Sequence, residues 1–324
     1  MKASKAIFAI ITGLSISGIS TGQQITDINF AYPGFSASVF YDNIQGPDGI
    51  VVKSNNSLKV VNEFGPDGPF VLIARRNGTY GTGDALSTIG PPLVSPDDLE
   101  AGKKKQLFIA DGQAQTVFKL PHNGGIPIPF VTLSTTGSDW FNPFGVEIAP
   151  PRFDGPNVNP GDLIVADNGF GDPSRHTLWA VNQQSGAAKI IAHGTVFEGG
   201  PLRAEFGPDG TLYVFENMGP SGTRRIVTVD ADGTVSPYVE FIPEGPALAV
   251  HPKNGDVYFI YGTGALFRVT DESGIPELFA SNLGRYQSIE FSHNGLSLFV
   301  SATARDQVIE ISGNRQAWGL SKDK

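Results

Sequence analysis

The sequence predicts an all-β fold, a six-bladed β-propeller, on three observations. One cassette of short strands and Gly-containing turns recurs along the chain. The 40 glycines and 24 prolines are spread through all 324 residues, as punctuation between many short strands. No stretch keeps a 3.6-residue apolar period for three turns, so no long amphipathic helix is expected. Repetition of a four-stranded unit is the signature of propeller blades.

The clearest copy of the cassette lies in the middle of the chain. An apolar-rich first strand, 200–206, leads into the turn Gly207-Pro208-Asp209-Gly210, then into a second strand, 211–217, and a third, 225–230. In a propeller the first strand of each blade lines the central channel, and the others follow it outward. We expect the other blades to keep this order.

First strands of four other blades follow from the same register. They are expected at 46–52, 142–148, 244–250 and 285–291. The equivalent residues Gly145, Arg203, Ala247 and Ser288 are spaced by 58, 44 and 41 residues, against ~40–50 residues for typical four-stranded repeats. The longest step contains an insertion rich in Pro, Gly and Asn, 150–162.

Blade two is the irregular copy. Its second strand, 106–111, and third strand, 116–120, are clear, and its first strand is expected near 90–94. Residues 75–90 predict a long exposed loop, and long loops in compact domains are often functional. Lys103–Lys105 is interpreted as a solvated turn rather than a binding patch.

The last blade lacks a fourth strand, because little chain follows its third strand, 307–311. The segment 37–41 precedes blade one and belongs to no blade. We therefore expect this N-terminal strand to complete the last blade and close the ring, which removes open sheet edges. The predicted organisation is one propeller, 23–318, with a short polar tail, 319–324.

The first 22 residues have the pattern of a secretory signal. Lys2 and Lys5 precede an apolar run, 6–14, which is followed by small residues to Gly22. The run is short for a membrane span, although a retained anchor is the alternative. Together with the absence of cysteine, this predicts a secreted or periplasmic protein. A net charge of -9 and the lack of a basic stripe argue against nucleic acid as a partner. A monomer with a small-molecule or extracellular ligand is expected.

Polar residues gather where first strands begin and second strands end, and propeller geometry brings these ends to one mouth of the channel. First strands supply Asp48, Asn142, Glu198, Glu244, Arg285 and Tyr286, and second strands supply Asp111, Asp167, Asn168, Glu216, Asn217 and Tyr261. Converging carboxylate and amide oxygens suit a hard cation such as Ca²⁺. They also suit an acid/base pair, and singly such residues often cap turns.

From this set we predict roles. The metal candidates are Asp48, Asn142, Glu198 and Glu244, and the substrate-binding candidates are Asn168, Asn217, Arg285 and Tyr286. The catalytic candidates are Glu147 and His176. Glu147, Glu205 and Glu290 share one register in three first strands, so they either line the channel or form buried ion pairs.

Motifs of other chemistries are absent from the sequence. The five histidines are dispersed, and only His176 is expected near the mouth, so a three-His zinc site is not predicted. No Gly-Xaa-Ser-Xaa-Gly elbow, phosphate loop or dinucleotide fingerprint occurs.

Several of these motifs give the chain a family resemblance. Pro47-Asp48-Gly49-Ile50, 207–214, 163–168 and 107–111 resemble the SMP-30/gluconolactonase and NHL-repeat group of six-bladed propellers. The resemblance implies a divalent cation, usually Ca²⁺, held at the channel mouth by acids and Asn at the starts of first strands. Asp48 matches that ligand set. The next register positions, Phe144, Leu202, Pro246 and Gln287, do not, and Asn142, Glu198 and Glu244 stand nearby.

Two functions are compatible with these observations. One is an exported metal-dependent hydrolase acting on a lactone or a similar small ester. The alternative is a non-catalytic propeller that binds a protein, peptide or glycan on its mouth face.

Overall fold

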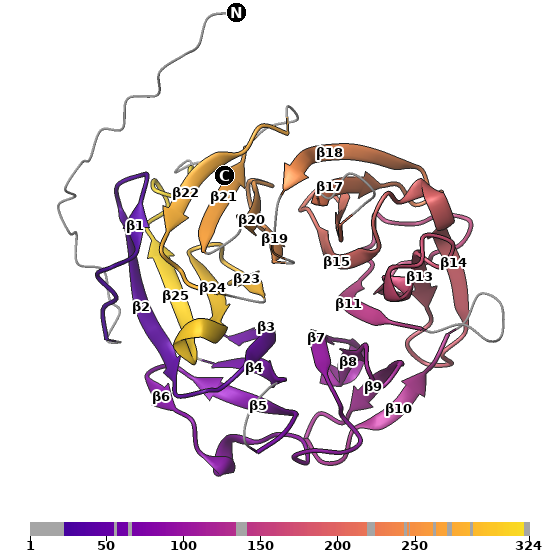
Figure 1. Ribbon diagram of the computed structural model, residues 1–324, viewed down its shortest axis with the longest axis horizontal. Coiled ribbons are helices and arrows are strands. Elements are labelled where there is room, and N and C mark those ends of the chain that lie inside the picture. Colours follow the sequence, from indigo (N-terminus) through magenta and orange to yellow (C-terminus); the bar gives the residue numbers. More distant parts are fainter. Residues whose placement is uncertain are drawn as a thin grey trace, which may run out of the picture.

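The computed structural model is a six-bladed β-propeller, with six sheets arranged around a central channel (Figure 1). It describes residues 23–54, 57–63, 67–133, 141–218, 224–242, 245, 247–261, 264–270, 274–285 and 288–320. The predicted signal segment, 1–22, lies outside the described residues, as do Glu244 and Tyr286. No helix within the described part of the chain is long and apolar enough to cross a membrane.

Blades one to three follow the predicted order from the channel outward. Blade one comprises β3 (Pro47–Ser54), β4 (Ser57–Asn62) and β5 (Phe70–Arg75); blade two, β7 (Pro96–Ala101), β8 (Leu107–Asp111), β9 (Thr116–Leu120) and β10 (Ile128–Val131); blade three, β11 (Pro143–Ile148), β12 (Leu163–Asp167), β13 (Thr177–Val181) and β14 (Ala188–His193).

Blades four to six repeat the same unit. Blade four comprises β15 (Pro201–Phe206), β16 (Leu212–Glu216), β17 (Arg224–Val229) and β18 (Val235–Ile242); blade five, β19 (Leu248–Val250), β20 (Val257–Tyr261), β21 (Ala265–Val269) and β22 (Glu277–Ser281); blade six, β23 (Ile289–Phe291), β24 (Ser297–Ala302) and β25 (Gln307–Gly313). Neighbouring strands within each of these blades are antiparallel.

The N-terminal segment closes the ring, as predicted. β2 (Phe35–Asp42) pairs antiparallel with β25 and becomes the outer strand of blade six. One pairing was not predicted from the sequence. β1 (Asn29–Phe30) also pairs with β22 and adds a fifth strand to blade five. The start of the propeller is therefore tied to its last two blades.

The predicted position of the first strand of blade two is wrong. That strand is β7 (Pro96–Ala101), whereas the residues near 90–94 form turns, with Leu93 buried. The apolar run before Ser95 misled the prediction, because a channel-lining strand need not be apolar: β7 reads Pro-Asp-Asp-Leu-Glu-Ala. The correction places Asp97, Asp98 and Glu100 on the channel.

The segment 75–90 is also less exposed than predicted. β6 (Gly78–Thr79) pairs in parallel with β2. Arg76 forms a bidentate ion pair with the buried Glu310 of β25. Lys103–Lys105 form an exposed turn between β7 and β8, which agrees with their interpretation as solvated.

The core lies between blades, and aromatic rings fill much of it. Trp318, fully buried, packs edge-on against Phe35 and stacks on Phe279. Phe40 of β2 packs edge-on against Phe299 of β24, with 5.1 Å between ring centroids. The N-terminal strand is thus held by packing as well as by backbone pairing.

Candidate functional site

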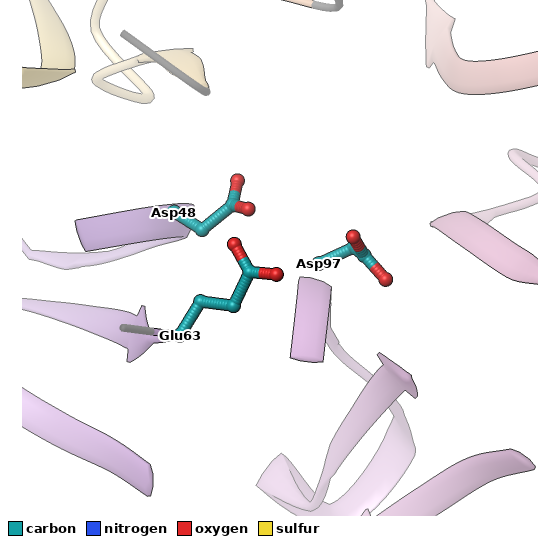
Figure 2. Close-up of side chains that lie close together, drawn as sticks. All are labelled: Asp48, Glu63 and Asp97. Carbon is teal, nitrogen blue, oxygen red and sulfur yellow. The ribbon is translucent and has the colours of Figure 1, made fainter. Parts of the chain in front are cut away.

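Three buried carboxyl groups converge at the mouth of the channel. Asp48 lies at the start of β3, Glu63 directly follows β4, and Asp97 lies at the start of β7. One oxygen from each lies within 4.8 Å of the others. Figure 2 shows the three side chains close together at the ends of strands of blades one and two. We call Asp48, Glu63 and Asp97 the acid cluster.

Local irregularities of the strands aim two of these side chains. The pairing of β3 with β4 shifts register between Pro47 and Ile50, and that of β7 with β8 shifts between Pro96 and Asp98. A proline at the start of a strand cannot continue the hydrogen-bonded ladder, and a bulge re-aims the residue that follows. The repeated Pro-Asp pair therefore places both aspartates at the mouth.

Each carboxyl of the acid cluster accepts a hydrogen bond from a group outside the cluster. Asp48 Oδ1 accepts from Arg203 Nη2 at 2.9 Å, and Asp97 Oδ2 accepts from the Gly112 amide at 3.0 Å. Glu63 Oε1 accepts from the Ser95 hydroxyl. The carboxyl groups of Asp48 and Glu63 also share a hydrogen bond, which requires one of the two to carry a proton.

Arg203 supplies a buried positive charge beside the acid cluster. It reaches across the channel from β15, and only 3% of its side chain is exposed. Nη2 also donates to the Asp97 carbonyl oxygen at 2.7 Å, and Nη1 lies 2.5 Å from Asp98 Oδ1. Burial acts to lower the pKa of Arg203, but the carboxylates of Asp98 and Asp48 outweigh it and raise that pKa above its ordinary value.

Burial governs the protonation of the acid cluster. It raises the pKa of Asp48 well above the ordinary value, with Arg203 opposing the rise and Asp97 adding to it. Burial also raises the pKa of Glu63 and of Asp97. Three carboxyl groups this close to one another share protons when only one guanidinium lies beside them. All three can be ionised when a cation binds between them.

The donor set fits a hard cation. All three ligand atoms are carboxylate oxygens, which Ca²⁺ and Mg²⁺ prefer, and no cysteine exists in the chain. Ca²⁺ takes about 6–8 oxygen ligands, so three carboxylates leave positions for water or for a substrate oxygen. The arrangement can therefore hold a cation that still reaches a substrate.

Of the predicted metal ligands, Asp48 lies in the acid cluster and Asn142 lies beside it. A side chain at Gly112 would begin 2.2 Å from Asn142 Oδ1 and 3.1 Å from Asp97 Oδ2, so both oxygens lie against this glycine. Glu198 is instead 55% exposed and pairs with Arg225 at 2.8 Å. Glu244 lies outside the described residues.

The four predicted substrate-binding residues do not share one environment in the structure. Asn168 is buried, and its Oδ1 accepts from the Phe170 amide and from Asn142 Nδ2, the first at 2.9 Å. Asn217 accepts from Arg224 Nε at 3.3 Å. Arg285 is exposed, and Tyr286 is not among the described residues. The structure thus connects Asn168, through Asn142, with the acid cluster.

Glu147 lies deeper in the channel, away from the acid cluster. It belongs to a second acidic group with Glu100, Glu205 and Glu290. Three of these glutamates line a cavity of about 210 Å³ together with His293, at the end of the channel opposite the mouth. Burial raises the pKa of Glu147 to about 8. No ion pair joins these four glutamates to a described cation, so they line the channel.

His176 is buried, with 2% of its surface exposed. Neither ring nitrogen has a hydrogen-bond partner among the described residues. Burial lowers the pKa of His176, so its imidazole is neutral at neutral pH.

Sequence reasoning missed Glu63 and Asp97, although a signal for each exists. Glu63 follows its second strand where Asn168 and Asn217 follow theirs, so the register of second strands points to it. Asp97 follows a proline as Asp48 does, and the misplaced first strand of blade two concealed the match. Both residues join Asp48 in the acid cluster.

Comparison with known proteins agrees with the fold. No family model matches the chain, and no curated protein matches it by sequence. A gluconolactonase from Xanthomonas campestris has a similar structure, with a TM-score of 0.69 at 15% identity over 91% of this chain and 98% of that chain. Virginiamycin B lyase from Staphylococcus aureus has a TM-score of 0.57 at 12% identity, over 86% of this chain and 99% of that chain.

An auxiliary nutrient binding protein from Bacteroides thetaiotaomicron also matches, with a TM-score of 0.60 at 11% identity over 86% of this chain and 76% of that chain. The chain that carries the acid cluster folds as a six-bladed propeller that is structurally similar to gluconolactonases and to virginiamycin B lyase. At these identities the likeness is one of fold, and the same propeller serves enzymes and a binding protein. Function must therefore be argued from the site.

Proposed function

We propose that this protein is a hydrolase that depends on a divalent cation, of the Ca²⁺ type, and acts on a lactone or small ester at the channel mouth. The acid cluster carries the proposal, since three buried carboxyl groups converge there. The structural similarity to a gluconolactonase supports it.

Asp48, Glu63 and Asp97 would hold the cation, with Asn142 Oδ1 beside them. A cation so held polarises a substrate carbonyl and lowers the pKa of bound water. Arg203 and the Gly112 amide fix two of the carboxylates in place, and Ser95 orients Glu63.

A second candidate is a non-catalytic module that binds a peptide, protein or glycan on the mouth face. One observation favours it: Arg203 already balances part of the buried negative charge without a metal. The similarity to a nutrient binding protein is compatible with it.

We also propose that the chain is exported and acts as a monomer. Mass spectrometry of the protein purified from the medium or periplasm tests export, and light scattering tests the monomer. An intact N-terminus on cell-associated protein would contradict the first, and a dimer mass the second.

Cation binding is the decisive test of the proposed hydrolase. Calorimetric titration with Ca²⁺ and with Mg²⁺ should show one site, and ligand at about 100 times its Kd should stabilise the fold by roughly 2.7 kcal/mol. Asp97→Asn should weaken binding at least tenfold. Asp209→Asn, at an exposed turn, is the matched control and should bind like the wild type.

Activity is tested by pH-stat titration of lactones and aryl esters, with Ca²⁺ and with chelator. Hydrolysis should require the cation and should fall in Asp97→Asn. Cation binding without hydrolysis across the panel would favour the binding module, and the absence of cation binding would remove the basis of the proposal.

A further inference from the structure

Among the residues that the structure describes, five large apolar side chains are exposed on the mouth face. Their exposed fractions run from 40% to 59%, and they come from the neighbouring blades two to five. We call them the apolar arc: Val94, Phe170, Val196, Met218 and Tyr261.

Chain topology places each of these residues on the same face as the acid cluster. Val94 precedes β7 and Val196 precedes β15, both first strands of blades. Phe170 follows β12, Met218 follows β16, and Tyr261 ends β20, all second strands. In every blade these two kinds of connection meet at the mouth, where Asp48, Glu63 and Asp97 also lie.

Two members of the apolar arc are tied to the acid cluster by short hydrogen-bonded paths. The Val94 amide donates to Asp111 Oδ2 at 2.7 Å, and the next residue, Ser95, donates to Glu63. The Phe170 amide donates to Asn168 Oδ1, which also accepts from Asn142. Val94 and Phe170 are therefore built into the same structure that positions the acids.

Phe170 has a backbone conformation that is unusual for an aromatic residue. Its φ of 53° and ψ of 33° lie in the left-handed region, which bulky residues rarely adopt. Gly169 and Gly171 on either side also have positive φ. Such conformations cost of order 1–3 kcal/mol and cluster at ligand-binding sites. Yet the Phe170 side chain is 45% exposed, so burial in the core does not account for this residue.

We propose that the substrate carries an apolar group, an alkyl or aryl substituent on the lactone or ester, which the apolar arc covers while the reacting carbonyl meets the acid cluster. This inference rests on the proposed function and names its substrate class. A polyhydroxylated sugar lactone fits poorly, because hydroxyl groups placed against Val, Met and Phe side chains would lose hydrogen bonds to water. Exposed apolar surface beside polar groups is typical of ligand sites.

The test compares two lactones on the full-length protein: a γ-lactone with a six-carbon alkyl tail and a polyhydroxylated δ-lactone. We expect kcat/KM to favour the alkyl lactone by at least tenfold. Lengthening the tail should add about twofold to fourfold per methylene, the range for partial to full burial of the group. Equal rates on both lactones would overturn this inference and leave the proposed hydrolase standing.

Substitutions in the apolar arc test whether the arc causes the preference for the alkyl lactone. Phe170→Asn keeps a residue that tolerates the left-handed conformation and removes the ring, while Val196→Thr conserves shape and adds a hydroxyl. Both should lower the preference for the alkyl lactone at least threefold. Ile126→Thr and Ile275→Thr are controls, because these residues are 64% and 68% exposed in loops at the opposite face, and they should not change the preference.

A second readout does not need catalysis. Calorimetry with the matching alkyl γ-lactam, which is not readily hydrolysed, should show binding that Phe170→Asn weakens at least threefold. If the lactam does not bind the wild type, or if the arc variants leave its affinity unchanged, the inference is wrong. If the arc variants change the oligomeric state of the protein and nothing else, the arc is covered by another protein molecule. That result also contradicts the proposal.

Discussion

At the scale of single residues, Arg203 has the largest influence on the channel. Its guanidinium contacts Asp48 and Asp98 and the Asp97 carbonyl oxygen, and nearly all of it is buried. Removing one partner of a buried ion pair leaves uncompensated charge in a poorly solvated place. Asp48 and Asp98 are the groups left behind.

We expect Arg203→Met to lower the free energy of unfolding by about 3–5 kcal/mol at pH 7. Urea unfolding measures this, and the loss should shrink at pH 4, where the aspartates bind protons. Arg305→Ala, which breaks the more exposed pair with Asp27, should cost far less, because water screens an exposed ion pair. Equal losses in the two variants would contradict the role given to Arg203.

The raised pKa of Glu147 predicts that the stability of the fold depends on pH. Burial raises its pKa to about 8 in the folded protein, against about 4.3 in an unfolded chain. A carboxyl whose folded pKa is raised destabilises the fold as pH rises between these two values, because the unfolded state ionises first. Glu147→Gln removes that ionisation.

From pH 5 to pH 8.5, the Tm of the wild type should therefore fall by more than the Tm of Glu147→Gln. The corresponding loss of unfolding free energy should be larger in the wild type by on the order of a few kcal/mol. Differential scanning calorimetry at both pH values measures it. Parallel pH profiles for the two proteins would show that Glu147 does not titrate as described.

At the scale of elements, β2 closes blade six, and its Phe40 packs fully buried against Phe299 with the guanidinium of Arg76 over its ring. Phe40→Ala leaves a cavity between β2 and β24 and should cost about 3–5 kcal/mol. Phe40→Leu, the control, keeps most of the volume and should cost clearly less. Urea unfolding compares them, and a loss below about 1 kcal/mol in Phe40→Ala would mean that β2 adds little.

The sequence predicted most elements because the cassette repeats, and it predicted β2 because the last blade lacked a strand. It did not predict β7, because channel-lining strands carry acids at positions where pattern recognition expects apolar residues. Asp48 was found by its motif. Asp97 shares the Pro-Asp pair but was hidden by that misplacement. Glu63 occupies the position after a second strand that Asn168 and Asn217 occupy in their blades, but only the fold shows that it meets Asp48 and Asp97.

At the scale of the whole molecule, the ring is closed by contacts between the two ends of the chain. β1 extends blade five and β2 extends blade six, so residues 29–42 cover the outer edges of β22 and β25. An uncovered strand edge presents unpaired N–H and C=O groups, which promote association with other chains.

Deleting residues 23–42 should therefore expose the edge of β25 and produce oligomers or aggregates, measured by light scattering coupled to size exclusion. Deleting only 23–33 removes β1 and leaves β2 paired, so this shorter truncation should remain monomeric and lose less stability. The acid cluster draws on blades one and two, which neither deletion removes. A monomeric and fully stable 23–42 deletion would show that four four-stranded blades and two three-stranded blades suffice to hold the ring.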